Sequence, residues 1–131
     1  MRYLIDSDVV IDFLADDPQT VTLLRSLTAD GIAVSIISYI ETYHGVIESG
    51  MLIEQRAFDA FFAGVPVLPV SPETARQCAH LRVMLKRQGK SFRKRAFDLV
   101  VAATALEHGL ELVTHNTDDY KDIPHLTLHQ S

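Results

Sequence analysis

Residues 3–14, YLIDSDVVIDFL, place a short apolar segment directly before a helical pattern and put an aspartate at the junction. The run Tyr3–Asp6 predicts a buried strand that ends on a carboxylate. Val9–Leu14 predicts one or two helical turns, which the Asp-Asp-Pro sequence of residues 16–18 brings to an end. A strand that passes at once into a helix is half of a βαβ unit, so this stretch predicts an α/β fold.

The rest of the chain continues this alternation. Apolar segments predict further strands at residues 32–36, 65–70, 110–114 and 126–129, and the prolines within 65–70 predict an edge strand. Amphipathic segments bounded by caps and glycines predict helices at residues 18–29, 38–49, 51–62, 72–88 and 97–108. We therefore expect one domain, residues 1–131, with about five parallel strands and helices on both faces of the sheet.

Composition limits the classes of protein to which the chain can belong. Its 131 residues are 47% apolar, enough for one hydrophobic core. No apolar run approaches the roughly 20 residues that span a bilayer, and the first residues lack the apolar region of a signal peptide. Cys78 is the only cysteine, which excludes an internal disulfide and a cysteine zinc site. We expect a cytoplasmic protein that does not associate with membranes.

The charges are unevenly distributed along the chain. The net charge is −5, which by itself argues against a nucleic-acid-binding protein. Residues 82–95, however, contain seven of the 12 basic residues and no acid. Such a local basic surface can hold phosphates whatever the net charge is. Charge alone leaves open the alternative of a solvated helix face followed by a loop.

Polar side chains follow the ends of the predicted strands. Asp6 ends the first strand, and Glu41 lies in the first predicted turn of the helix after the second strand. Asp98 lies in the first turn of the helix before the fourth strand, and Asn116 and Asp118 follow that strand. In a parallel sheet these positions share one edge, which is where such folds bind ligands.

Carboxylates crowded at one edge repel one another and raise each other's pKa. A hard divalent cation, Mg²⁺ or Mn²⁺, relieves the repulsion, because it prefers oxygen ligands and is bound by a few carboxylates together with water and phosphate. Such a cation can acidify a bound water and stabilise charge on a phosphodiester. An acidic cluster beside a basic segment therefore predicts a metal-dependent nuclease.

Each of these residues also has a structural explanation. Asp6 could cap the following helix, although Asp8 is the better candidate for that cap. Ser38 and Glu41 form the S-x-x-E pattern of a capping box, and Asp98 would be favoured near a helix N-terminus by the macrodipole. Residues 116–119 have the composition of an ordinary turn. The nuclease hypothesis depends on their convergence at one edge.

Three segments resemble the motifs of the PIN-domain VapC toxins, and the resemblance covers essentially the whole chain. The opening YLIDSDVVIDFL is similar to the first motif of that family, and residues 35–46, SIISYIETYHGV, are similar to the second. Residues 97–120, FDLVVAATALEHGLELVTHNTDDY, resemble the third and fourth motifs run together. The order and spacing of these segments make the resemblance specific.

The resemblance implies a PIN-like domain that binds Mg²⁺ or Mn²⁺ and cleaves RNA endonucleolytically. Asp6, Glu41 and Asp98 match the three principal acids, and Asp6 and Asp98 are the expected metal ligands. Ser7 matches a hydroxyl that supports the site. Asn116 departs from the aspartate that many PIN domains carry.

The departure at Asn116 leaves the fourth acidic position open, because asparagine supplies no charge. Asp118 or Asp119 could fill that position, for a second metal. The departure therefore puts the number of metal ions in doubt more than the function.

In the expected mechanism, water attacks the phosphodiester while Glu41 orients the metal's waters or acts as general base. Four basic residues are expected to hold the RNA backbone: Lys90, Arg93, Lys94 and Arg95. The chain has no Trp and few obvious exposed aromatic residues for stacking on bases. Recognition is therefore expected to depend on RNA shape and backbone, with the preferred site in a loop.

The resemblance also implies protein partners. A small DNA-binding antitoxin of the VapB type is expected to lay its C-terminal segment across the acidic edge, with Val9–Leu14 and Met51–Phe62 forming an apolar groove. A two-fold homodimer is expected as well. The competing interpretation is that both apolar helices are buried within the monomer's own core.

Two other functions remain open from the sequence. Asp6 and Asp8 fit the D-x-D pattern of haloacid-dehalogenase-type phosphatases, in which Asp6 would be the nucleophile and Asp8 the acid. Glu41 and Asp98 would then have no role. The other alternative is an inactive PIN-fold module that binds RNA or a partner and has lost activity through Asn116.

Overall fold

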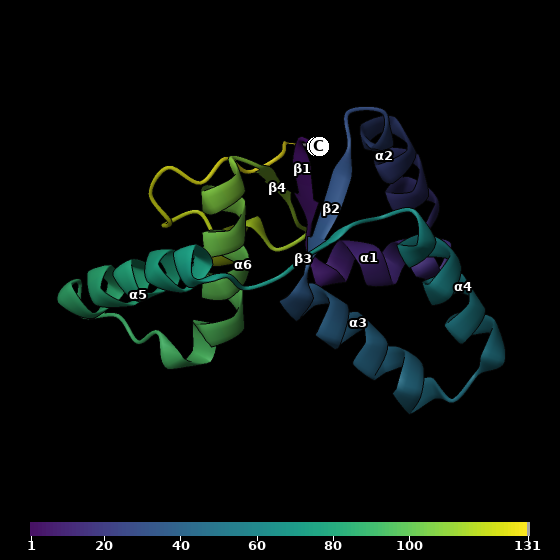
Figure 1. The fold of residues 1–131 in the computed structure, drawn as a ribbon, viewed down its shortest axis with the longest axis horizontal. Helices are drawn as coiled ribbons and strands as arrows, with labels where there is room; N and C mark the ends of the chain where they lie inside the picture. The colour runs from purple at the N-terminus through teal and green to yellow at the C-terminus, as the bar shows by residue number, and fades with distance from the viewer. Residues whose placement is uncertain (131) are drawn as a thin grey trace.

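Four short strands form one parallel sheet in the computed structural model, which describes residues 1–130 (Figure 1). They are β1 (Tyr3–Ile5), β2 (Ile32–Ser35), β3 (Val67–Leu68) and β4 (Glu111–Val113), in the order β3-β2-β1-β4. In register, β1 pairs Tyr3 with Ile32 on one side and with Glu111 on the other. The first strand is therefore central, and the proline-flanked β3 lies at an edge, as the sequence predicts.

The helices alternate with the strands along the chain. The α-helices are α1 (Ser7–Leu14), α2 (Pro18–Thr28), α3 (Ile36–Ser49), α4 (Leu52–Ala63), α5 (Pro72–Arg87) and α6 (Ala96–His108). Two short 3-10 helices, η1 (Arg93–Arg95) and η2 (Thr117–Asp119), precede α6 and follow β4. In the described residues 1–130, no helix is both long enough and apolar enough to cross a membrane.

The expected fifth strand is reduced to a single bridge. The N–H of Leu112 donates to the carbonyl of Thr127, and the N–H of His129 donates to the carbonyl of Leu112, both at 2.8 Å. Leu128 is the one residue of this segment that bridges to β4. His125 has a positive φ of 66°, which turns the chain just before it reaches the sheet. The segment therefore meets β4 too briefly to form a strand.

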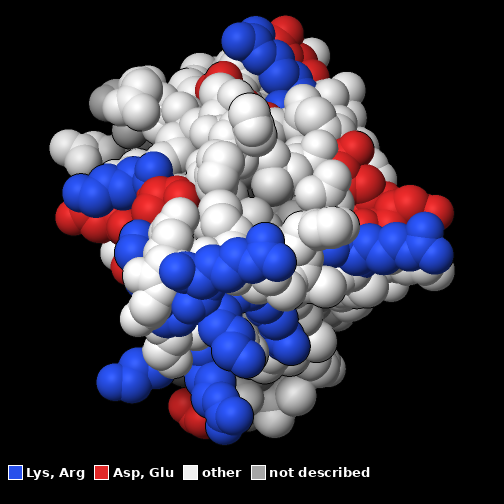
Figure 2. Space-filling model, turned by 90° about the vertical axis from the view of Figure 1, so that its left-hand side faces the viewer, with Lys and Arg blue, Asp and Glu red and all other residues white. Residues whose placement is uncertain are grey.

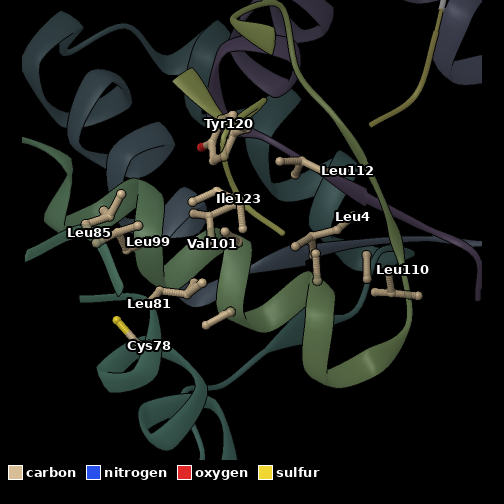
Figure 3. Packing of buried hydrophobic residues seen from close by; sticks show 14 residues of the cluster. Leu4, Cys78, Leu81, Leu85, Leu99, Val101, Leu110, Leu112, Tyr120 and Ile123 are labelled. Atoms are coloured by element: carbon tan, nitrogen blue, oxygen red, sulfur yellow. The ribbon is translucent and has the colours of Figure 1, made fainter. Parts of the chain in front are cut away.

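Alternate residues of the central strand face two separate hydrophobic clusters. Leu4 packs with Leu112 and with the helices α5 and α6, whose Leu81 and Leu99 point into the same cluster (Figure 3). Tyr3 and Ile5 face the other side, where α1 and α2 cover the sheet. Helices therefore cover both faces, as the sequence predicts. This packing holds the ends of β1 and β4 side by side.

Helix α3 begins earlier than the sequence predicts, and its cap is Ser35. The Ser35 hydroxyl accepts a hydrogen bond from the N–H of Ser38 at 3.1 Å, and the two hydroxyls lie 3.2 Å apart. The predicted capping box between Ser38 and Glu41 is therefore wrong. Ser35 is the last residue of β2 and has extended backbone, so the chain enters the helix without a loop. Glu41 consequently lies beyond the first turn and has no capping role.

We expect the substitution Ser35→Ala to lower the free energy of unfolding by about 1–2 kcal/mol, because it removes a buried cap and leaves the Ser38 hydroxyl with one partner fewer. Urea denaturation followed by circular dichroism measures the change. Ser26→Ala is the matched control, since Ser26 is an exposed serine whose hydroxyl binds only a carbonyl in its own helix. Equal stabilities of the two variants would contradict the role given to Ser35.

Candidate active site

Asp6 is a buried carboxylate at the junction of β1 and α1. Its side chain is only 6% exposed, and it is the N-cap of α1, a role for which the sequence favours Asp8. One carboxylate oxygen accepts the N–H of Ser7 at 2.9 Å. The other accepts the hydroxyls of Thr114 and Tyr120, each at 3.0 Å. Three donors from separate parts of the chain therefore satisfy this buried charge.

Tyr120 connects Asp6 to Asp98, which lies in the first turn of α6. Its hydroxyl is 3.0 Å from an oxygen of Asp6 and 3.2 Å from an oxygen of Asp98. The tyrosine is 1% exposed, and burial together with the two carboxylates raises its pKa far above the ordinary value. The phenol therefore keeps its proton and remains a donor.

The sequence reasoning missed Tyr120. A tyrosine at the end of an acidic turn resembles an ordinary core aromatic, and only its nearness to two motif acids could have drawn attention to it. Its function as a link between two carboxylates depends on the packing of the segment after β4 against α6.

Glu41 and Ser7 complete the group on the side of α3. Partial burial raises the pKa of Glu41, a hydrogen bond from Ser7 opposes the increase, and the charges of Asp6, Asp98 and Asp8 add to it. Burial likewise raises the pKa of Asp98, while the hydrogen bond from Tyr120 opposes it and the charge of Asp6 adds to it. The three principal acids predicted from the sequence are thus close enough to interact electrostatically.

Asp8 holds the loop after β4. One of its oxygens accepts the N–H of His115 at 3.1 Å, the side-chain amide of Asn116 at 2.9 Å and the hydroxyl of Thr114 at 3.3 Å. Its other oxygen is buried and has no hydrogen-bond partner within residues 1–130. Burial and the charge of Asp6 raise the pKa of Asp8. An asparagine at position 116 therefore suits this chain, because an aspartate there would face the carboxylate of Asp8.

The structure does not bring Asp118 to the other acids. Its side chain is 86% exposed and pairs with Lys121 at 3.0 Å. Asp119 is also exposed, but its charge contributes to the raised pKa of Asp98. Of the two candidates for a fourth carboxylate, Asp119 is therefore the one that acts on the site.

The four predicted RNA-binding cations fall into two groups. Arg95 donates to both oxygens of Asp122 at 2.8 and 2.7 Å, and Lys90 donates to Asp122 at 3.0 Å. These bonds lower the pKa of Asp122 well below its ordinary value and raise that of Arg95. In contrast, Arg93 and Lys94 are exposed and form no ion pair with another described residue. Lys90 and Arg95 hold the chain together, whereas Arg93 and Lys94 are free for a ligand.

Arg93 and Lys94 line a recess together with two of the acids. The recess has a volume of about 370 Å³, and its walls also include Glu41, Phe97 and Asp98. Figure 2 shows Lys and Arg side chains gathered on the side of the molecule where α5 lies in Figure 1. The structure therefore places carboxylates and unpaired cations around one opening.

The donor atoms fit a hydrated divalent cation better than an ion enclosed by protein. Within residues 1–130, no three His, Cys, Asp or Glu side chains converge closely enough to form a metal cage. Mg²⁺ usually keeps several waters and takes one or two carboxylates from the protein. Asp6 and Asp98, which are connected through one hydroxyl, are a pair of oxygen donors of this kind.

Comparison with known proteins identifies related chains of similar length. The family model described as PIN domain matches residues 3–126. The tRNA(fMet)-specific endonuclease VapC of Shigella flexneri is 24% identical over 124 residues, which cover 94% of this chain and 92% of that protein. Ribonuclease VapC2 of Rickettsia felis is 27% identical over 131 residues, with coverage of 98% and 96%.

A solved structure is similar over the same length. In the crystal structure of VapBC2 from Rickettsia felis bound to a DNA fragment from their promoter, one chain matches with a TM-score of 0.84 and 25% identity. The match covers 98% of both chains. Fold and sequence therefore agree on the same relatives.

The raised pKa of Asp98 predicts a pH-dependent effect of the substitution Asp98→Asn. A carboxyl whose folded pKa lies above its unfolded value loses stabilising free energy as pH rises through that interval. In EDTA, we expect Asp98→Asn to be more stable than the wild type at pH 7.5. This advantage should shrink as the pH falls towards the ordinary pKa of 3.8.

Urea denaturation at several pH values measures this difference. Asp59→Asn, which changes an exposed carboxyl on α4, is the control and should show no such trend. A variant Asp98→Asn that is less stable than the wild type at pH 7.5 would show that the acids are not in conflict.

Proposed function

The chain belongs to the PIN-domain family, and from this premise we propose that it is a VapC-type endoribonuclease that requires Mg²⁺ or Mn²⁺. The observation that carries the proposal is the pairing of Asp6 and Asp98 through Tyr120, at 3.0 and 3.2 Å, with Glu41 coupled to both by charge. The two relatives named endonuclease and ribonuclease support the same reaction class.

Asp6 and Asp98 would hold the cation. When bound, a divalent cation neutralises crowded carboxylates, acidifies a bound water and stabilises charge on the phosphodiester. Tyr120 orients the two carboxylates and keeps its own proton, because its pKa is far above neutrality. Glu41 accepts the proton of the attacking water, and its raised pKa makes it a better base near neutral pH. Ser7 orients the Glu41 carboxyl through its hydrogen bond.

Arg93 and Lys94 are the residues that we assign to the RNA backbone. They are exposed, carry no ion pair with another described residue and line the same recess as Glu41 and Asp98. Lys90 and Arg95 act indirectly, because their bonds to Asp122 hold the segment after η2 against η1. Phosphate contacts of this kind fix the position of the chain without reading its sequence.

The two alternative functions fit less well. A phosphatase would need Asp8 as a mobile acid, whereas one oxygen of Asp8 accepts three hydrogen bonds from the loop after β4. An inactive module would not need to retain the crowded acids Asp6, Glu41 and Asp98, which raise the pKa of one another's carboxyls. Manganese titration by calorimetry separates these cases, since an inactive module should bind the metal weakly.

A groove beside the acidic edge supports a protein partner. Ile11 and Leu14 of α1 face Val46 of α3 across a recess of about 190 Å³. A second recess of about 500 Å³ follows between α1 and α4, where the side chain of Ile53 is 70% exposed. The two apolar helices are therefore not wholly buried in the monomer's core, contrary to the competing interpretation.

We assign this groove to the amphipathic segment of a small DNA-binding antitoxin. The similar chain from Rickettsia felis was solved as VapBC2 bound to promoter DNA, which supports a partner of that kind. An Arg or Lys of the segment would pair with the acids of the site and stop the reaction. We also propose a two-fold homodimer, for which light scattering is the test.

We expect Glu41→Gln to reduce RNA cleavage by at least about 100-fold, because the variant lacks the general base. Its free energy of unfolding should not fall, since Glu41 has no capping role. Cleavage of total bacterial RNA in Mg²⁺ or Mn²⁺, mapped by primer extension and compared with an EDTA control, measures the effect.

Glu48→Gln on the same helix is the matched control, because Glu48 is exposed and pairs only with His44. Asp98→Asn should abolish cleavage as well, through loss of a metal ligand. If Glu41→Gln or Asp98→Asn cleaves RNA at the wild-type rate, the site is wrongly assigned.

We expect Ile53→Asp to weaken binding of the antitoxin by at least about 10-fold, because it places a charge in the apolar groove. RNA cleavage by the free variant should be unchanged. Titration with the protein encoded by the neighbouring gene, followed by calorimetry, measures the affinity. Thr22→Asp, on the exposed side of α2, is the control. Unaltered affinity of Ile53→Asp would place the partner elsewhere on the surface.

A further inference from the structure

Phe97 is an exposed aromatic residue beside the acids of the site. Its side chain is 58% exposed, and it lies in the first turn of α6 directly before Asp98. It lines the recess of about 370 Å³ together with Glu41, Arg93 and Lys94. The sequence analysis expected few exposed aromatic residues, so this position is a finding of the tertiary structure.

The other phenylalanines of the chain have partners within the protein. Phe13, Phe58, Phe61 and Phe62 belong to aromatic pairs with ring centroids 4.7 to 5.4 Å apart. The ring of Phe92 packs against the cluster under α5 and receives the guanidinium of Arg82 at 5.0 Å. Among the described residues, Phe97 takes part in no aromatic or cation-π pair of this kind. Its ring face is therefore available to a ligand.

An exposed apolar side chain is by itself unremarkable on a protein surface. What distinguishes Phe97 is its place between unpaired cations, Arg93 and Lys94, and the carboxylates of Glu41 and Asp98. A ligand that fits all three features must have a flat apolar surface, a nearby negative charge and a bond that the site can attack. A nucleotide within a single RNA strand has these properties, because its base can stack and its phosphate is anionic.

We propose that Phe97 is the stacking platform for one unpaired RNA base next to the cleaved phosphodiester. The base lies on the ring while Arg93 and Lys94 hold the adjoining phosphate, so the chain passes through the recess towards Asp98. A paired base cannot lie flat on the ring without leaving its helix. The site therefore selects single-stranded RNA. This inference rests on the function proposed above.

The test uses the absence of tryptophan from the chain. In Phe97→Trp, the introduced indole is the only tryptophan, so its fluorescence reports on the recess alone. We expect an eight-nucleotide single-stranded RNA, added in EDTA to prevent cleavage, to quench this fluorescence. A hairpin duplex of the same base composition, and a strand of abasic nucleotides, should quench it far less. Equal quenching by the abasic strand would overturn the proposal.

Affinity provides the second measurement. By fluorescence anisotropy with labelled single-stranded RNA in EDTA, we expect Phe97→Leu to weaken binding by roughly 5- to 100-fold, and Phe97→Trp to retain it. Val83→Ala, which shortens an exposed apolar side chain on α5, is the control and should bind as the wild type does. Phe97→Leu that binds RNA with wild-type affinity would overturn the proposal.

Two further outcomes have definite meanings. If Phe97→Leu changes the oligomeric state in light scattering while RNA affinity is unchanged, Phe97 belongs to an interface between copies and the proposal fails. Failure of the proposed function is a separate result, namely a wild-type protein that cleaves no RNA in Mg²⁺ or Mn²⁺. A wild type that cleaves RNA, with a Phe97→Leu variant of undiminished affinity, rejects the stacking platform alone.

Discussion

The carboxylate of Asp6 is buried at the end of the central strand, and the rest of the site depends on satisfying its charge. Burying an ionised group costs several kcal/mol unless hydrogen bonds compensate for the lost water. Asp6 obtains these bonds from the N–H of Ser7 and from the hydroxyls of Thr114 and Tyr120. Because these donors come from α1, the end of β4 and the segment after η2, one charge orders three parts of the chain around itself.

The same arrangement leaves the site electrostatically strained. Asp8, Glu41 and Asp98 all have raised pKa values, with burial as the largest cause and neighbouring carboxylates as a further one. A fold selected only for stability would place such charges in water. Retaining them is typical of a site that acts on a bound cation or proton. The neutral amide of Asn116 lessens the conflict, because it donates to Asp8 where an aspartate would repel it.

The basic side of the molecule divides its work between structure and ligand binding. Asp122 takes Lys90 and Arg95, and this three-residue ion pair holds the chain after η2 against η1. The bonds within it are partly shielded from solvent, so they can contribute more than an exposed pair does. Arg93 and Lys94 are left free at the recess, on either side of which lie the acids and the ring of Phe97. Cations, carboxylates and an aromatic face thus meet at one opening.

Much of this could be derived from the sequence. Apolar periodicity and helix punctuation determined the order of strands and helices, and the direction of parallel strands placed Asp6, Glu41 and Asp98 at one edge, because both follow from local backbone geometry. Pairings between distant residues were decided only by the tertiary structure. Tyr120 meets Asp6 and Asp98, Asp8 meets Asn116, and Arg95 meets Asp122 across separations of 22 to 114 residues. The cap at Ser35 and the loss of the fifth strand also depended on where the chain enters or leaves the sheet. Local patterns report what each segment prefers, whereas the partner of a buried or charged side chain is determined by which segments pack together.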